Sequence, residues 1–288
     1  MAAIKSYKGF DKNLKCRDFQ YEIGKEYEMD GEIKVCSRGF HSCESPFDVF
    51  DHYTMIDSRF CEVEQDGNIS KKDRGTKICS SKIKIKAELK LADMINLGVE
   101  WLKEITSPEK IKTSMKDNSS GNYAQIGSSG DDAQIGSSGD GAKIGSSGDG
   151  AKIGSSGNGA QIGSSGNYAQ IGSSGNYAQI GSSGDGAKIG SSGNYAQIGS
   201  SGDGAQIGSS GNYAQIDSTG EGCVIMCAGI NSVAKASKGS WITLSEWSYS
   251  DKKQRYIPVC VKTEFVDGEK IKADTYYKLD GGVFKEIQ

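Results

Sequence analysis

The sequence predicts a mainly β protein: a parallel β-solenoid capped by a small N-terminal α+β domain and a C-terminal β module. The main observation is a nine-residue unit that repeats without interruption from Gly121 to Thr219, in eleven copies. Repetition at a fixed period is typical of solenoids. The second observation is compositional, because the 288 residues include 40 glycines and only 3 prolines. Much of the length therefore cannot form a conventional globular core.

Each unit reads Gly, Asn or Asp, Tyr or Gly, Ala, Gln or Lys, Ile, Gly, Ser, Ser. Apolar and polar residues alternate in Ala124-Gln125-Ile126, which predicts a short strand with alanine and isoleucine on one side. The glycines and serines supply the turns. Nine residues are too few to close a coil, so we expect two units per turn, forming a β-roll with two parallel sheets. A flexible linker would have no reason to keep alanine and isoleucine in phase.

A weaker eighteen-residue period supports two units per turn. Asparagine recurs at the second position of alternate units and acidic residues at that of the others, with Asp140 and Asn167 as exceptions. Duplication of an eighteen-residue segment would give the same pattern without structure. If the coil forms, its edges carry rows of identical side chains, which we take as the binding surface. The predicted surface residues are Asn176, Asn194, Asn212, Tyr177, Tyr195, Tyr213, Asp131, Asp149, Asp185, Asp203 and Glu221.

The charges argue against several kinds of ligand. A net charge of -3 does not suit a strongly basic nucleic-acid-binding protein, so direct binding of nucleic acid is not expected. Lys143, Lys152 and Lys188 each follow an aspartate by three positions, which predicts local ion pairs. The calcium-binding nonapeptide reads G-G-x-G-x-D-x-U-x. Alignment to it places Ala133 near the carboxylate position, so we expect neither calcium nor any other cofactor.

The composition divides the chain into four segments. Residues 1–108 form the α+β domain, 109–120 a linker or first irregular coil, 121–236 the solenoid and 237–288 the C-terminal β cap. A cap is needed because the end of a solenoid is an open sheet edge. In the first domain we expect strands at 4–7, 32–36, 60–64, 77–79 and 82–85, and helices at 45–50 and 91–105. In the last segments we expect an irregular coil at 230–236 and strands at 240–244 and 256–261.

The cysteines and the N-terminus suggest a compartment. The sequence has no apolar run long enough to span a membrane and no apolar signal core at its start. We therefore expect a cytoplasmic protein whose 8 cysteines are free and mostly buried. Cys36, His41 and Cys43 have the spacing of half a zinc site, which Cys16 or Cys61 could complete. Core cysteines beside a strand-terminal histidine are the simpler interpretation.

The N-terminal domain also contains an enzyme-like pattern. Residues 38–43, with a helix that ends at His52-Tyr53, and Tyr7-Lys8-Gly9 at the first strand, resemble the corresponding segments of ADP-ribosyltransferases. The resemblance implies a catalytic centre around His41, Tyr7 and Lys8. No Glu-x-Glu occurs between Lys77 and Ile85, where those enzymes carry their catalytic glutamate. We therefore predict no catalytic residue, with this enzyme as an alternative.

Three motifs resemble uncharacterised proteins of phages and prophages: Tyr7-Lys8-Gly9-Phe10, the segment Gly39 to Cys43, and Trp241-Ile242-Thr243-Leu244-Ser245-Glu246-Trp247. The resemblance implies a phage or prophage product in the cytosol of a bacterium. We expect a non-catalytic protein whose rigid solenoid engages a protein partner and inhibits a host defence or nucleic-acid-processing enzyme. A virion-associated spike or adhesin is the alternative. A homo-oligomer is consistent with either function.

Overall fold

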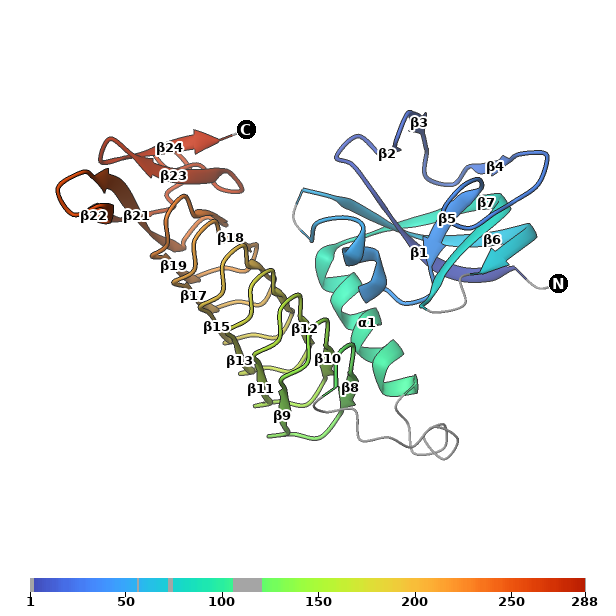
Figure 1. Ribbon diagram of the computed structural model, residues 1–288, viewed down its shortest axis with the longest axis horizontal. Helices are drawn as coiled ribbons and strands as arrows, with labels where there is room; N and C mark the ends of the chain where they lie inside the picture. Colours follow the sequence, from blue (N-terminus) through green and yellow to red (C-terminus); the bar gives the residue numbers. More distant parts are fainter. Residues whose placement is uncertain (1–2, 56, 72–74, 106–120, 288) are drawn as a thin grey trace. The chain divides into compact units, whose positions relative to one another are not determined.

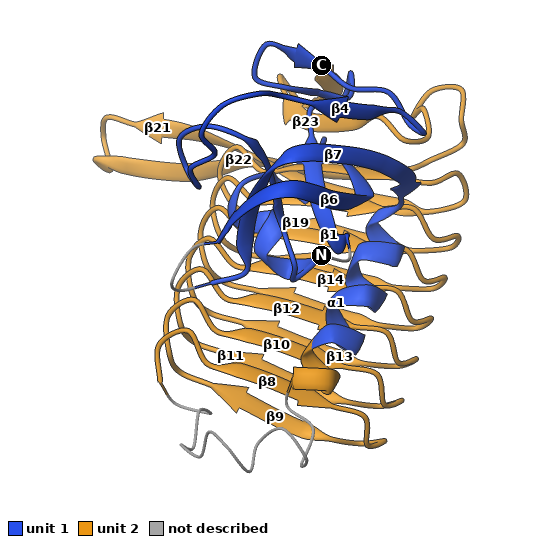
Figure 2. Ribbon diagram, turned by 90° about the vertical axis from the view of Figure 1, so that its right-hand side faces the viewer, with its two compact units in different colours: residues 1–101 blue, residues 102–288 orange. Residues whose placement is uncertain are grey.

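The computed structural model describes residues 3–55, 57–71, 75–105 and 121–287 (Figure 1). The chain forms two compact units, residues 1–101 and 102–288 (Figure 2). It is mainly β, with an N-terminal sheet domain, a parallel solenoid and an antiparallel C-terminal part. The predicted linker at 109–120 lies outside the described residues. Within them, no helix is both long and apolar enough to cross a membrane.

The sheet of the first unit closes on itself. Four strands, β1 (Ile4–Phe10), β5 (Phe40–Cys43), β6 (Arg59–Lys71) and β7 (Lys77–Leu89), pair around a ring in the order β1, β5, β7, β6 and back to β1. A short strand, β4 (Glu26–Glu28), is added to β7. The strands β2 (Lys15–Cys16) and β3 (Phe19–Gln20) form a separate small hairpin. The side chains inside form an apolar core of Phe10, Leu14, Tyr21, Phe40, Cys61, Val63, Ile83 and Ile85.

Two helical segments lie in the sequence where expected. The short one is a 3₁₀ helix, η1 (Phe47–Asp51), preceded by Pro46. The longer one, α1 (Leu91–Ile105), has the predicted bounds, and the Lys90 N–H donates a hydrogen bond of 2.8 Å to the Asp93 carboxylate at its start. Its buried face consists of Met94, Ile95, Val99 and Leu102. The spacing of these apolar residues therefore places one face of the helix in the core.

Two strand predictions in this unit need correction. The strand expected at 32–36 does not form, and only an isolated bridge joins Lys34 to Arg38. The backbone turns there because Gly31, Cys36 and Gly39 all adopt positive φ angles, which interrupt an extended chain. The two strands expected at 77–79 and 82–85 are one strand, β7, because Ser80 and Ser81 between them are also extended and buried.

The repeat forms the predicted solenoid of about seven turns. Strands of four residues each, from β8 (Gln125–Ser128) to β20 (Val233–Ala236), alternate between two parallel sheets. Every strand pairs with the one eighteen residues away, as in the register of Ile171 with Ile153 and Ile189. Figure 2 shows the strands of unit 2 stacked as parallel rungs. The prediction of two units per turn is confirmed. The intervening strands are β9 (Gln134–Ser137), β10 (Lys143–Ser146), β11 (Lys152–Ser155), β12 (Gln161–Ser164), β13 (Gln170–Ser173), β14 (Gln179–Ser182), β15 (Lys188–Ser191), β16 (Gln197–Ser200), β17 (Gln206–Ser209), β18 (Gln215–Ser218) and β19 (Val224–Cys227).

The C-terminal part continues the coil before it caps it. The segment expected to be an irregular coil contains β20, which pairs in register with β18. The first half of β21 (Trp241–Ser250) stacks in parallel on β19. Along its whole length, β21 also pairs with the antiparallel strand β22 (Arg255–Phe265). The hairpin of β23 (Tyr276–Asp280) and β24 (Val283–Ile287) pairs with β20 in the other sheet. Each sheet thus ends in an antiparallel hairpin.

The interior of the solenoid contains serine as well as alanine and isoleucine. The first serine of each unit lies at the inward end of its strand, so Ser164, Ser173 and Ser182 are buried. Their hydroxyls have no hydrogen-bond partner within the part of the chain that the structure describes. The alternation that places isoleucine inward also places this serine inward two residues later. The sequence analysis assigned these serines to turns and missed their burial.

A buried hydroxyl without a partner costs about 1–3 kcal/mol, so we expect Ser173→Ala to leave the solenoid as stable or to stabilise it. The measurement is the free energy of unfolding by urea. Ser174→Ala, at the exposed neighbour, is the control and should change stability by less than about 0.5 kcal/mol. A loss of more than about 1 kcal/mol in Ser173→Ala alone would show that this hydroxyl has a stabilising partner.

Candidate functional site

The Asn and Asp rows on the two edges of the solenoid have a structural role. The Asn176 Oδ1 accepts a hydrogen bond of 2.8 Å from the Asn194 N–H one turn later. On the other edge, the Asp185 Oδ1 accepts one of 2.9 Å from the Asp203 N–H. Only an acceptor oxygen is needed, so asparagine and aspartate are interchangeable, which explains why Asp140 and Asn167 depart from the alternation. The same bond is made by Asn194 to the Asn212 N–H, Asn212 to Ile230, Asp131 to Asp149, Asp149 to Asn167 and Asp203 to Glu221.

Two of the three lysines in the repeat do not pair as predicted. Among the described residues, Lys152 and Lys188 form no ion pair; both extend from the exposed outer face of the sheet that contains β11 and β15. The expectation that each would pair with the aspartate three residues earlier is wrong for these two. The reason is geometric, because the aspartate lies in the turn and its side chain points along the stack to the next coil.

The tyrosine row has a geometry that the fold does not require. The rings of Tyr177, Tyr195 and Tyr213 are stacked, with centroids 5.0 and 4.9 Å apart and planes within 5°. They are 60%, 44% and 44% exposed, and we call these three residues the tyrosine ladder. Each has a φ near +58°, a left-handed conformation that is unusual for a bulky residue.

The turn itself explains why tyrosine alternates with glycine in the sequence. Glycine occupies the same position with the same sign of φ in other turns, for example at Gly159 and Gly204. Tyrosine there costs about 1 kcal/mol of backbone strain relative to glycine. Glycine adopts the same conformation in other turns without this strain, and such strain often marks a functional site.

A small groove adjoins the ladder. It has a volume of about 330 Å³ and is lined by Tyr195, Tyr213, Gln197, Gln215, Asn231, Val233 and Ile287. Two ladder rings form part of its wall, while β16, β18 and β20 contribute outward-facing side chains. The ladder thus combines an exposed aromatic strip with a hollow beside it.

A second candidate site is a cavity of about 600 Å³ in the first unit. Its lining includes five residues singled out from the sequence, namely Tyr7, Lys8, Cys36, His41 and Cys43. The fold brings them together because β1 and β5 are adjacent strands. Ser42, His52 and Tyr53 of the enzyme-like pattern also line the cavity, as does Cys16. The sequence analysis missed Arg17, Asp18 and Lys77 as site residues.

The buried lysine Lys8 is central to this cavity. Its side chain is 4% exposed, its Nζ donates to the His41 carbonyl oxygen at 3.0 Å, and it lies 3.4 Å from the Cys16 Sγ. The Tyr53 hydroxyl donates to the same sulfur at 2.9 Å. Burial lowers the pKa of Lys8, since desolvation disfavours the charged form.

His41 is held as a neutral ring. Its Nε2 accepts a hydrogen bond of 2.9 Å from the Cys36 N–H. Burial, with Lys77 and Lys8 nearby, lowers the pKa of His41 to about 4. Because the Nε2 lone pair is already engaged, the ring has no free Nε2 for a metal ion or for accepting a proton.

The other residues considered for zinc are not gathered at one point. Cys61 packs in the apolar core, where burial raises its pKa to about 12, whereas Cys36 is exposed. Among the described residues, no three His, Cys, Asp or Glu side chains are placed to hold a metal ion. None of the eight cysteines forms a disulfide.

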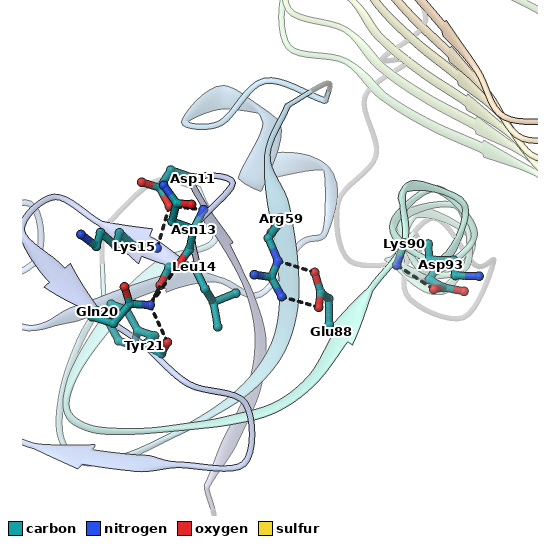
Figure 3. A network of polar contacts seen from close by, with 10 residues as sticks. All are labelled: Asp11, Asn13, Leu14, Lys15, Gln20, Tyr21, Arg59, Glu88, Lys90 and Asp93. Carbon is teal, nitrogen blue, oxygen red and sulfur yellow. Dashed lines mark hydrogen bonds and ion pairs between the residues drawn. The ribbon is translucent and has the colours of Figure 1, made fainter. Parts of the chain in front are cut away.

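The loop that carries Cys16 and Arg17 is fixed by its own hydrogen bonds (Figure 3). The Asp11 carboxylate accepts bonds of 2.8 Å from the Asn13 and Lys15 N–H groups. The Gln20 amide donates to the Asn13 and Tyr21 carbonyl oxygens, both at 2.9 Å. Figure 3 also shows the Arg59 guanidinium joined to the Glu88 carboxylate by two bonds of 2.6 Å, between β6 and β7. The contacts of Asp11 and Gln20 hold the loop that brings Cys16 and Arg17 to the cavity.

The comparisons with known proteins identify only the first unit. No curated protein and no solved structure matches the chain. Residues 4–97 match a family model described as a domain of unknown function, DUF7666. That span runs from the start of β1 into α1 and includes every residue that lines the cavity. The chain therefore consists of an N-terminal DUF7666 domain followed by a β-solenoid.

Proposed function

We propose that this chain is a non-catalytic binding protein that engages a protein partner through the tyrosine ladder of its solenoid. The observation that carries the proposal is the conformation of Tyr177, Tyr195 and Tyr213, which hold left-handed backbone positions that glycine fills elsewhere in the repeat. Their rings are exposed and stacked. Tyrosine is enriched at protein interfaces because its rigid ring supplies apolar area and its hydroxyl remains solvated.

The polar rows on the two edges of the solenoid support a protein partner over a nucleic acid. The Asn side chains beside the ladder and the Asp side chains on the other edge each commit one oxygen to the coil, so their positions are fixed before a partner arrives. Preorganised side chains lose little conformational entropy on binding. The acidic row repels the phosphate backbone of nucleic acids. The resemblance to phage and prophage proteins makes a host defence or nucleic-acid-processing enzyme, inhibited in the bacterial cytosol, the partner we propose.

The test is a variant in which all three ladder tyrosines become glycine. Because Gly159, Gly186 and Gly204 adopt the same left-handed conformation, the triple variant should fold, with lost stacking offset by relief of strain. Tyr168→Gly is the matched control, since Tyr168 is 69% exposed and left-handed but lies on the other edge.

The tagged full-length chain would be used to purify partners from its native host, and the affinity of each for the purified variants would then be measured. We expect partners that bind the wild type and Tyr168→Gly but bind the triple variant at least tenfold more weakly. Equal affinity for all three proteins would refute the proposal. The same would follow if the wild type enriched no host protein.

A further inference from the structure

The cavity of the first unit has an unbalanced set of charges. Lys8, Arg17 and Lys77 line it, and Asp18 is its one carboxylate. Among the described residues, none of the three cations forms an ion pair; the hydrogen bonds of Lys8 go to a carbonyl oxygen and a sulfur. His41 is neutral at pH 7, since its pKa is lowered to about 4, and does not alter the balance.

Burying the charged side chain of Lys8 is energetically unfavourable unless it interacts with an opposite charge. Lys8 is almost fully buried, and burying an ammonium group away from carboxylates is unfavourable. An ammonium has three donors, of which two are directed at His41 and Cys16. The third, together with Arg17 and Lys77 on other parts of the lining, is suited to an anionic group inside the cavity.

The backbone around the cavity also has unusual φ angles and one close approach to a ring. Arg17 and Cys36 adopt φ angles of 55° and 66°, which are uncommon for residues with a side chain. A Cβ at Gly9 would overlap the Tyr53 ring, so this glycine allows the ring to form part of the wall. Strained residues and close approaches of this kind cluster at binding sites.

Aromatic rings form much of the remaining lining. Phe19, Tyr21 and Phe40 pack edge to face with one another, with centroids 4.7 to 6.4 Å apart, and Tyr53 lies on the lining as well. Such walls accept flat groups by stacking or by edge contacts. A volume of about 600 Å³ lies within the range of pockets for small organic ligands.

We propose that this cavity binds a small organic anion that carries a flat ring, with the anionic group held by Lys8, Arg17 and Lys77 and the ring against the aromatic wall. Phosphate monoesters and free carboxylates of aromatic compounds share this chemistry. The site is separate from the tyrosine ladder, so binding here does not depend on the function proposed above.

The test uses adenosine 5′-monophosphate, adenosine and inorganic phosphate as probes of the full-length chain. Cys16 and Cys36 line the cavity, whereas Cys260 lies in the second unit. The rate at which iodoacetamide alkylates each cysteine can be followed by mass spectrometry. We expect the monophosphate to slow alkylation of Cys16 several-fold, adenosine and phosphate to act more weakly, and Cys260 to be unaffected.

Substitutions test which side chains bind the anionic group. Arg17→Gln and Lys77→Gln should each weaken protection by the monophosphate about tenfold, whereas Lys12→Gln, an exposed cation that does not line the cavity, should not. The binding constant from calorimetry provides a second readout that does not need Cys16. If adenosine protects as well as its monophosphate, or neither protects, or Lys12→Gln weakens binding as much as Lys77→Gln, the proposal is wrong.

Discussion

Gly175→Ala is expected to destabilise the solenoid by about 3 kcal/mol or more, because its added methyl group has no space. A Cβ at Gly175 would overlap the carbonyl group of Gly157 in the turn below. Backbone cannot move aside as a flexible side chain can. The first glycine of the unit makes the same close approach in the neighbouring turns, as Gly157 does to Gly139 and Gly193 to Gly175. The repeat keeps this glycine for close stacking.

A matched control exists three residues earlier. A Cβ at Gly172 meets no atom within 4 Å, because this glycine lies on the exposed outer face of β13. Gly172→Ala should therefore change stability by less than about 1 kcal/mol. Chemical denaturation followed by circular dichroism measures both variants. Similar losses in the two would show that the stacking contact is not what limits the first position.

Ile171→Ala is expected to cost about 2–5 kcal/mol, the usual range for removing a large aliphatic side chain from a core. Ile171 is 3% exposed and packs in a thin apolar cluster that runs the length of the solenoid. The turns above and below contribute identical isoleucines, Ile153 and Ile189. These keep the backbone in place, so the cavity cannot close by collapse.

The neighbouring outward residue is the control for this variant. Gln170 is exposed on the same strand, so Gln170→Ala should alter the free energy of unfolding by less than about 0.5 kcal/mol. Amide exchange adds a spatial readout, since Ile171→Ala should speed exchange most in the turns next to it. Equal effects of the two substitutions would mean that the alternation of inward and outward residues along β13 is wrong.

The repeat was predictable because its geometry is local and recurs. The period, the two units per turn and the inward isoleucines follow from the pattern in one unit. The burial of the serine two residues after each isoleucine also follows from that alternation, but composition favours a turn for Gly-Ser-Ser. The hydrogen bonds of the Asn and Asp side chains could not be predicted, because they join one turn to the next and nothing within a single unit indicates them.

The cavity was predictable only in part. Tyr7, Lys8, His41 and Cys43 stood out because they fall in short motifs on two strands, and those strands turned out to be neighbours. Arg17 and Lys77 carry no motif. Lys77 reaches the site because it lies opposite Cys43 in the pairing of β7 with β5, and Arg17 lies in the turn between β2 and β3. Such contacts depend on how the sheet closes, which no local pattern specifies.

The uniform left-handed turn at the third position of each unit has an evolutionary consequence. The backbone accepts either glycine or tyrosine at this position, so the exposed side chain can change while the coil stays the same. Recombination between identical repeats would insert or delete whole turns of eighteen residues and lengthen or shorten the row of rings in steps of about 4.8 Å. Related genes could therefore change the length of the exposed tyrosine row while the fold of the coil stays the same.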